Sequence, residues 1–257
     1  MAGNNGGGAV KSDETLLAIV DGLVALDGAT ITELKEHVGV SKSTVHRHLT
    51  TLERHQYVVK EGDTYHVGLR FLDLGGYARD RKAAHKIVEP KVGELAEETG
   101  QICQFIVEEH SLGVFLYREW AGDTVRTGAR VGTRSHLHQT AAGKAILSQL
   151  PPARVDEIVD RWGLPGETEH TITERDELAA ELETIRDRGY SVDKDEHTEG
   201  LWAVGAPVNG PDGGVLGGLS VAGPTHRMKG KFEEEIPGIL LRIANECQLD
   251  VAYSRRL

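Results

Sequence analysis

The chain has 257 residues, of which 39% are hydrophobic and 27% charged, so it can bury a core and is not expected to be disordered. Asp and Glu number 40 against 29 Lys and Arg, and the formal net charge of -11 is spread along the chain. Two cysteines exclude a disulfide framework, no Cys/His spacing fits a metal site, and no apolar run reaches the ~20 residues that span a membrane. We therefore expect a soluble cytoplasmic protein without metal or cofactor.

The charge has a further implication for the environment of the protein. Most basic residues are Arg, and Lys is scarce. A spread acidic surface with few lysines is typical of proteins from organisms that keep molar salt in the cytoplasm, where the Debye length is about 3 Å. We interpret the sequence as halophilic and archaeal, the alternative being an ordinary acidic protein.

The first third of the chain predicts a DNA-binding fold. Residues 1–11 form a Gly/Asn-rich arm that we expect to be disordered, and a helix is expected to start at Ser12. Thr30 and Glu33 predict a capping box at a second helix, Gly39 predicts a tight turn, and Ser41 predicts the N-cap of a third helix. Three short helices with a glycine turn before the third indicate a helix-turn-helix.

The third helix has one apolar face and one polar face. If Val45, Leu49 and Leu52 point inward, the opposite face carries hydrogen-bonding side chains in a locally basic segment. A solvated helix face is the alternative, but the three-helix context favours DNA recognition. A hairpin predicted around Glu61–Gly62–Asp63 would be the wing. The predicted DNA-binding residues are Ser41, Lys42, Ser43, Thr44, His46, Arg47 and Thr50, with Lys60 and Tyr65 on the wing.

The segments "STVHRHLTTLERHQYV" and "YHVGLRFLDLG" resemble the winged helix of the isocitrate lyase regulator (IclR) family of transcription factors. Helix-compatible residues 69–86 resemble the linker helix of that family, and Pro90 predicts the start of a further helix. The expected organisation is a winged helix over residues 12–75, a linker helix over 76–89 and an effector-binding domain over 90–257.

The second part of the chain predicts an antiparallel sheet flanked by helices, so the expected fold class is α+β. "GTRSHLHQTAAGKAIL" and "EHTEGLWAVGAPV" followed by "GLSVAGP" also resemble the IclR family. The resemblance implies a GAF-like effector-binding domain, a homodimer or homotetramer, an operator of double-stranded DNA and no enzymatic activity. It implies effector contacts from Thr127 and Ser135 at the mouth, Thr140, Ala141 and Ala142 at a helix start, Asp193, and a floor of Leu201, Ala203, Ser220 and Ala222.

The helix start and Asp193 favour different ligand groups. Free N–H groups suit a carboxylate, whereas Asp193 suits hydroxyls, so we expect a sugar acid, a keto acid or a related catabolic intermediate, with an aromatic acid as the alternative. The family often has Cys where this chain has Ala203. Small residues at Ala203 and Ala222 predict room for a ligand larger than a two- or three-carbon acid.

Other functions fit the sequence less well. "AAGKA" lacks the upstream glycine and the Ser or Thr of a P-loop. Ser220 approximates a hydrolase nucleophile, but it lies inside a β-run with no helix expected after it. His138, Asp193, Asp195 and His197 are more simply polar loop residues than metal ligands. The main alternative is a small-molecule sensor that acts through protein partners, and a hydrolase based on Ser220 is a weaker one.

Overall fold

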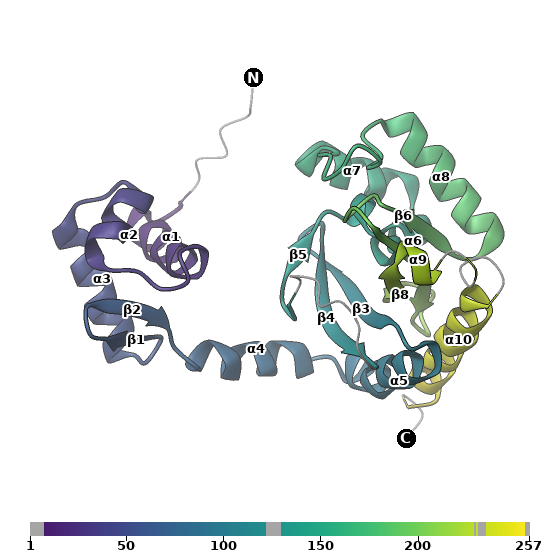
Figure 1. Cartoon of the computed structure of the whole chain (residues 1–257), viewed down its shortest axis with the longest axis horizontal. Coiled ribbons are helices and arrows are strands. Elements are labelled where there is room, and N and C mark those ends of the chain that lie inside the picture. Colours follow the sequence, from purple (N-terminus) through teal and green to yellow (C-terminus); the bar gives the residue numbers. More distant parts are fainter. Residues whose placement is uncertain (1–7, 122–129, 229, 231–234, 255–257) are drawn as a thin grey trace. The chain divides into compact units, whose positions relative to one another are not determined.

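The computed structural model describes residues 8–121, 130–228, 230 and 235–254. The chain forms two compact units, Met1–Ala78 and Arg79–Leu257 (Figure 1). Most of the predicted arm and the predicted effector contact Thr127 lie outside the described residues. None of the described helices is long and apolar enough to cross a membrane.

The first unit is a winged helix-turn-helix, as predicted. It contains α1 (Lys11–Ala25), α2 (Ile31–Val38), α3 (Lys42–Arg54), β1 (Val58–Glu61) and β2 (Thr64–Val67). The capping box of α2 is present, because the Thr30 N–H donates to Glu33 Oε2 at 2.8 Å and the Glu33 N–H to Thr30 Oγ1 at 3.3 Å. Gly39 ends α2 in the left-handed conformation, with φ of 73°. The N-cap of the first helix is Val10 and not Ser12, two residues earlier than predicted.

The wing corrects one predicted DNA contact. β1 and β2 pair antiparallel with Glu61 opposite Thr64, and Tyr65 forms a further bridge to Ala29. This register turns the Tyr65 ring into the core of the unit, where only 5% of the residue is exposed. The Lys60 ammonium lies 5.4 Å from the centroid of that ring. Tyr65 is therefore a core residue that supports Lys60, and its predicted contact with DNA was wrong.

The linker differs from the prediction because a helix continues through a proline. α4 (Arg70–Asp80) ends before Arg81, and α5 (Ala83–Thr99) begins seven residues before Pro90 and includes it. A proline inside a helix costs ~3 kcal/mol. Here the ring of Pro90 is exposed, while Val88, Val92 and Leu95 are fully buried at helical spacing. Burial of that apolar face outweighs the lost hydrogen bond, so the predicted helix start at Pro90 and the unbroken linker helix were wrong.

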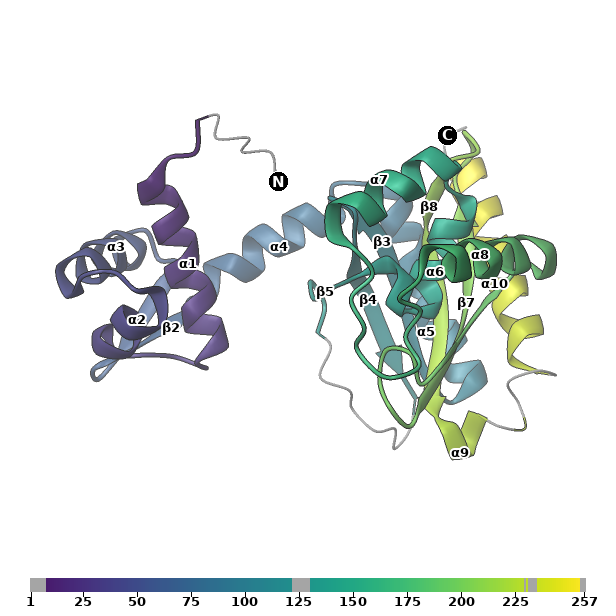
Figure 2. The ribbon, with the colours of Figure 1, turned by 90° about the horizontal axis from the view of Figure 1, so that it is seen from above.

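The second unit contains a six-stranded antiparallel sheet with the order β5-β4-β3-β8-β7-β6. One face of the sheet is covered by α5 and α10, and the other by α6, α7 and α8 (Figure 2). The strands are β3 (Ile102–Glu109), β4 (Leu112–Trp120), β5 (Arg134–Ser135), β6 (Ser191–Lys194), β7 (Leu201–Asn209) and β8 (Val215–Pro224). The remaining elements are η1 (Leu137–Gln139), α6 (Ala141–Gln149), α7 (Pro152–Trp162), α8 (Arg175–Arg188), α9 (Thr225–Met228) and α10 (Ile236–Ser254).

Successive side chains along β7 and β8 lie on opposite faces of the sheet. Val204 and Val221 belong to the large apolar core under α5 and α10. Ala203 and Ala222, one position away, pair with each other and lie on the opposite face with Ala141 of α6. The face toward α6 therefore carries small side chains, and the functional candidates predicted from sequence lie there.

Candidate functional site

The start of α6 rests directly on the sheet because two strands carry glycine beneath it. A Cβ at Gly205 of β7 would lie 2.4 Å from the Ala141 carbonyl carbon, and one at Gly218 of β8 would lie 2.4 Å from the Ala142 carbonyl oxygen. The Ser191 hydroxyl donates to the Ala141 carbonyl at 2.5 Å and fixes the contact from β6. Any larger residue at the two glycines would displace the helix, so these strands determine where its first turn lies.

The first turn of α6 offers free hydrogen-bond donors. Thr140 is the N-cap, and its Oγ1 accepts from the Gly143 N–H at 3.0 Å. The N–H groups of Ala141 and Ala142 have no acceptor among the residues that the structure describes. Unpaired N–H groups and the helix dipole make this position favourable for an anion.

A cavity of about 80 Å³ adjoins this first turn. Its polar walls include Asp193, Ser220 and Gln104, which lies opposite Ser220 in the β3–β8 register. The full lining is Gln104, Phe115, Thr140, Ala141, Asp193, His197, Thr198, Leu201, Ala203, Ser220 and Ala222. Its volume is well below the ~300–1,000 Å³ of pockets for drug-sized ligands. The expectation of a ligand larger than a two- or three-carbon acid is therefore not supported by this cavity.

Seven of the ten predicted effector residues line the cavity, two do not, and one cannot be placed. Ala142 is fully buried in the core between α6 and the neighbouring helices, and Ser135 is buried in β5 outside the lining. Thr127 lies outside the described residues. The prediction missed Gln104, Phe115, His197 and Thr198. For Gln104 a signal was available, because it interrupts the apolar run of residues 102–107.

Among the described residues that line the cavity, Asp193 is the only one with a carboxylate, and it is 4% exposed. Its Oδ1 accepts from the Glu196 N–H at 2.8 Å. Burial raises the pKa of Asp193 to about 7, with a further contribution from the negative charge of Glu196, while Lys144 opposes the shift. Asp193 can therefore exchange a proton near neutral pH, which an exposed aspartate does not do.

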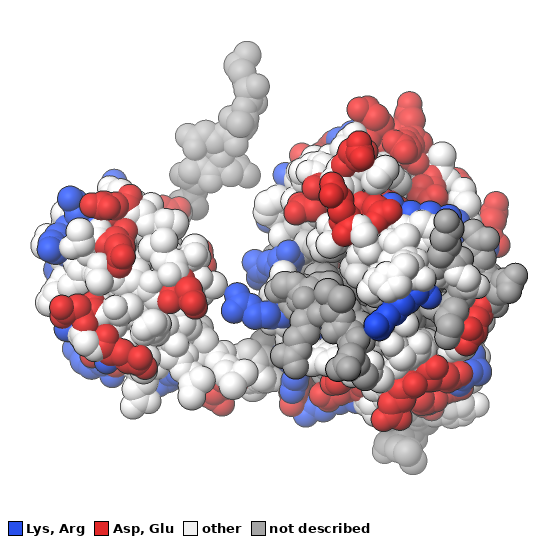
Figure 3. Space-filling model, in the orientation of Figure 1, with Lys and Arg blue, Asp and Glu red and all other residues white. Residues whose placement is uncertain are grey.

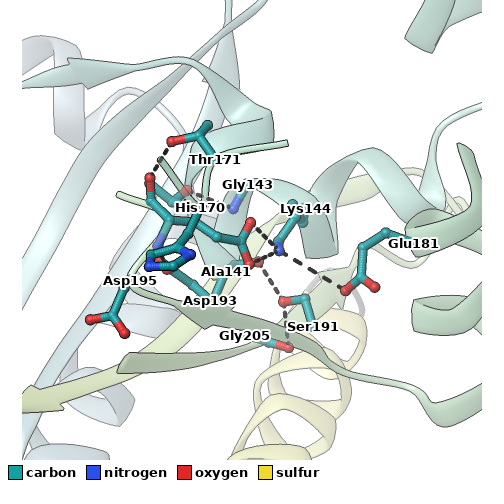
Figure 4. A network of polar contacts seen from close by, with 12 residues as sticks. Ala141, Gly143, Lys144, His170, Thr171, Glu181, Ser191, Asp193, Asp195 and Gly205 are labelled. Atoms are coloured by element: carbon teal, nitrogen blue, oxygen red, sulfur yellow. Dashed lines mark hydrogen bonds and ion pairs between the residues drawn. The ribbon is translucent and has the colours of Figure 1, made fainter. Parts of the chain in front are cut away.

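Lys144 and Glu196 form a buried ion pair. Figure 4 shows Lys144 of α6 within the surrounding network of polar contacts. The Thr171 hydroxyl donates to the Glu196 carbonyl at 2.6 Å, and the Thr168 hydroxyl donates to the Asp195 carbonyl at 2.7 Å. These contacts hold the loop that follows β6 and carries His197 into the cavity wall. Lys144 of the "AAGKA" segment therefore has a structural role as the partner of Glu196. This role accounts for the lysine without a phosphate-binding P-loop.

The geometry does not support a nucleophile or a metal centre. Ser220 lies four residues before the end of β8, and its Oγ is 3.5 Å from Gln104 Oε1. A short helix, α9, does follow β8, contrary to expectation, but a nucleophile elbow requires the strand-to-helix turn at the serine itself. Among the described residues, no group of three or more His, Cys, Asp or Glu side chains could hold a metal ion.

The predicted DNA-reading face lies on α3. Val45, Leu49 and Leu52 are buried, whereas Ser43, His46, Arg47 and Thr50 are exposed on the other side of the helix. The Ser41 hydroxyl caps the helix by accepting from the Thr44 N–H at 3.2 Å, and Thr44 is half-buried. Ser41, Lys42 and Lys60 are also exposed. Acidic side chains are spread over the face of the protein seen in Figure 3, in agreement with the charge distribution of the sequence.

A winged helix-turn-helix in one unit, and a helix-flanked antiparallel sheet with a small polar cavity in the other, define a DNA-binding transcription regulator. The family models agree with both units. Residues 79–249 match the model described as "Bacterial transcriptional regulator IclR C-terminal", and residues 16–62 match the "IclR helix-turn-helix domain". The chain belongs to the IclR family of transcriptional regulators. Members of this family are regulators and not enzymes, which confirms the prediction from sequence.

Known relatives cover nearly the whole chain. It is 29% identical to "Probable HTH-type transcriptional regulator ArcR" of Halobacterium salinarum over 98% of both sequences. The solved structure of IclR from Thermotoga maritima superimposes with a TM-score of 0.76 and 26% identity, covering 95% of this chain and 98% of that one. An IclR homologue from Microbacterium hydrocarbonoxydans, solved in complex with 4-hydroxybenzoate, gives a TM-score of 0.76 and 21% identity over 93% of this chain and 99% of its own. At 21% identity this last comparison shows a shared fold.

Proposed function

We propose that the protein regulates a catabolic pathway, and that a small carboxylate in the α6 cavity controls its affinity for an operator. The observation that carries the proposal is that Ala141, whose N–H is free at the start of α6, and the buried carboxyl group of Asp193 line one cavity. Asp193 Oδ1 accepts one backbone N–H, from Glu196, and a buried polar group that is left without a partner costs free energy. The proposed occupant satisfies both groups.

The cavity favours a short hydroxy acid or keto acid. The carboxylate of such a ligand would accept from the Ala141 N–H, and its hydroxyl or keto group would face Asp193 and Ser220. A volume of about 80 Å³ disfavours a six-carbon sugar acid and an aromatic acid unless the walls move. The 4-hydroxybenzoate of the Microbacterium relative is aromatic, so the two proteins would differ in ligand size.

The operator is proposed to be a pseudo-palindrome that two copies of α3 read through Ser43, His46 and Arg47. An arginine can form a bidentate contact with guanine, and serine and histidine can each bond a base edge. Wing residue Lys60 is exposed and would lie near a phosphate.

A homodimer or homotetramer is proposed because α4 carries uncovered apolar side chains. α4 has no buried residue. Leu69 just before it is 83% exposed, and Leu72 and Tyr77 within it are 72% and 74% exposed. Exposed large apolar groups close together indicate a surface that another chain covers.

Identification of the promoters bound in the cell tests this function. Genomic DNA fragments captured by the protein should share one pseudo-palindromic sequence, and short hydroxy or keto acids should change their gel shift. Ala203→Val and Ala203→Trp, which fill the cavity, should abolish the acid effect but not the shift itself. Ala153→Trp, on the exposed surface of α7, is the control. Failure to retain any DNA fragment, together with capture of a protein partner, would favour a sensor that acts through proteins.

A further inference from the structure

We propose that the effector carboxylate enters the α6 cavity together with one proton, which it shares with the carboxyl group of Asp193. The inference deepens the proposed function and rests on it. It follows from the small size of the cavity, the burial of Asp193 and the existing ion pair of the neighbouring Lys144 with Glu196.

The cavity brings any bound carboxylate close to Asp193. Ala141 and Asp193 both line this cavity of about 80 Å³, and Asp193 is 4% exposed. Asp193 is the strand partner of Ala203, which packs against Ala141. A carboxylate that binds the free N–H of Ala141 therefore lies in the same small space as the Asp193 carboxyl group.

The repulsion between two such anions exceeds the attraction of the helix start. At an effective dielectric constant of about 20, two like charges ~4 Å apart would weaken binding roughly a thousandfold. A helix N-terminus strengthens anion binding by about twofold to thirtyfold. The carboxylate therefore binds well only if one of the two negative charges is removed, and a shared proton removes it.

The other charged groups that face Asp193 do not cancel the repulsion. On the same loop, Glu196 adds negative charge, and burial lowers the pKa of His197, which favours its neutral form. From α6, the Lys144 ammonium is already bonded to both carboxylate oxygens of Glu196. The neighbouring strands β3, β7 and β8 contribute the uncharged residues Gln104, Leu201, Ala203, Ser220 and Ala222 to the lining.

The shared proton is already on Asp193 at low pH and is taken from the solvent at high pH. Burial raises its pKa to about 7, so below neutral pH the free protein already holds the proton and above neutral pH it must take one up. Effector affinity is therefore constant in mildly acidic solution. Above about pH 7 it falls by up to about tenfold per pH unit, because each unit reduces the protonated fraction tenfold.

Calorimetry measures the proton directly. Lactate and pyruvate are titrated into the full-length protein in molar KCl between pH 5.5 and 9, at each pH in two buffers of different ionisation enthalpy. We expect uptake close to one proton per ligand at pH 8.5 and close to none at pH 5.5. Asp193→Asn, which keeps the shape but cannot ionise, should bind the acids with a flat pH profile and no proton uptake. Glu199→Gln, an exposed residue on the same loop, should behave as the unmodified protein.

The outcomes separate the proposal from the function on which it rests. Binding of either acid without proton uptake at pH 8.5, or an unchanged pH profile in Asp193→Asn, overturns the shared proton but leaves the effector cavity in place. Absence of binding of both acids at pH 5.5 overturns both. Lactamide, the neutral counterpart of lactate, should bind without proton uptake and gives the baseline for a ligand that carries no charge.

Discussion

The ammonium group of Lys144 lies 2.5 and 2.6 Å from the two carboxylate oxygens of Glu196, and the two side chains are 1% and 12% exposed. The pair joins α6, which supplies the free N–H groups, to the loop that carries His197 and Thr198. One buried interaction therefore links the helix wall and the loop wall of the cavity. Burial raises the pKa of Glu196 and Lys144 opposes that shift, so the carboxylate depends on its partner to remain charged.

Lys144→Met should reduce the free energy of unfolding by about 3–5 kcal/mol, because it leaves Glu196 buried without a counter-ion. Lys144→Met combined with Glu196→Leu should recover much of that loss. Urea unfolding in molar KCl measures the difference. Lys86→Met removes a lysine that is 54% exposed and pairs with Asp80 at 3.1 Å, and should cost no more than about 1 kcal/mol. Equal losses in the two single variants would contradict the assigned role of the buried pair.

Gly205→Ala should abolish effector binding. A Cβ at this position would meet the Ala141 backbone at 2.4 Å and push the first turn of α6 off the sheet. The expected cost in stability is about 1–3 kcal/mol, in the range of overpacked cores. Gly93→Ala in α5 is the control, because a Cβ there meets no atom within 4 Å and alanine favours the helix. Calorimetric titration together with thermal unfolding distinguishes a lost cavity from a lost fold.

Arg47→Ala should weaken specific operator binding by about 1–3 kcal/mol, the contribution of one good base contact. Lys35→Ala removes an exposed cation from α2 and serves as the control. Fluorescence anisotropy with operator and scrambled duplexes measures both affinity and discrimination. Equal binding of the two duplexes by the unmodified protein and by Arg47→Ala would remove α3 from the recognition surface.

The pH dependence of stability should reflect the raised pKa of Asp193. A group whose folded-state pKa lies above its unfolded value stabilises the fold at low pH, and that stability is lost as pH rises through the folded pKa. Between the ordinary value of 3.8 and about 7, the protein should lose stability relative to Asp193→Asn, by an amount on the order of 4 kcal/mol. Urea unfolding of both proteins at pH 4, 5.5, 7 and 8 tests the difference. A constant gap between the two curves would show that Asp193 titrates as an exposed carboxylate does.

Salt should stabilise the fold and leave specific DNA binding largely intact. The net charge is -11, and screening of the acidic surface reduces its self-repulsion. Phosphate contacts weaken as salt rises, so binding that persists in molar KCl must come from base edges and shape. Measurements of the thermal unfolding temperature and of operator affinity across 0.1–3 M KCl test both expectations. Greatest stability in dilute buffer would indicate an ordinary acidic protein.

Local rules predicted the cap and turn of α2 in the first unit but not where α5 begins in the second. The capping box at Thr30 and the left-handed Gly39 follow from residue chemistry within one or two turns, and both are present. Pro90 shows the limit, because its cost is offset by packing against strands distant in sequence. At the start of α7, by contrast, Pro152 occupies the first turn, where a proline is well tolerated.

The cavity was predictable in composition but not in size. Small residues at 203 and 222 suggested space, yet the glycines beneath α6 allow the helix to approach and occupy much of it. Burial of Tyr65 likewise depends on its bridge to Ala29, which no spacing rule in the wing reveals. The missed residues His197 and Thr198 reach the cavity because Lys144 and two threonines hold their loop, and such long-range contacts leave no local periodic signal.

The exposed α4 has a consequence for how firmly the two units are connected. The helix runs over Arg70–Asp80, buries no residue and contains Gly75–Gly76. Each glycine costs about 1 kcal/mol, and isolated helices shorter than ~12–15 residues are marginal in water. In a solitary chain this segment would unwind often and exchange its amide hydrogens quickly, whereas a second copy that covers Leu69, Leu72 and Tyr77 would keep it wound. Dilution of the protein would therefore unwind α4 into a flexible connection. At low protein concentration, the effect of the effector on DNA binding would then be weaker, even at saturating effector.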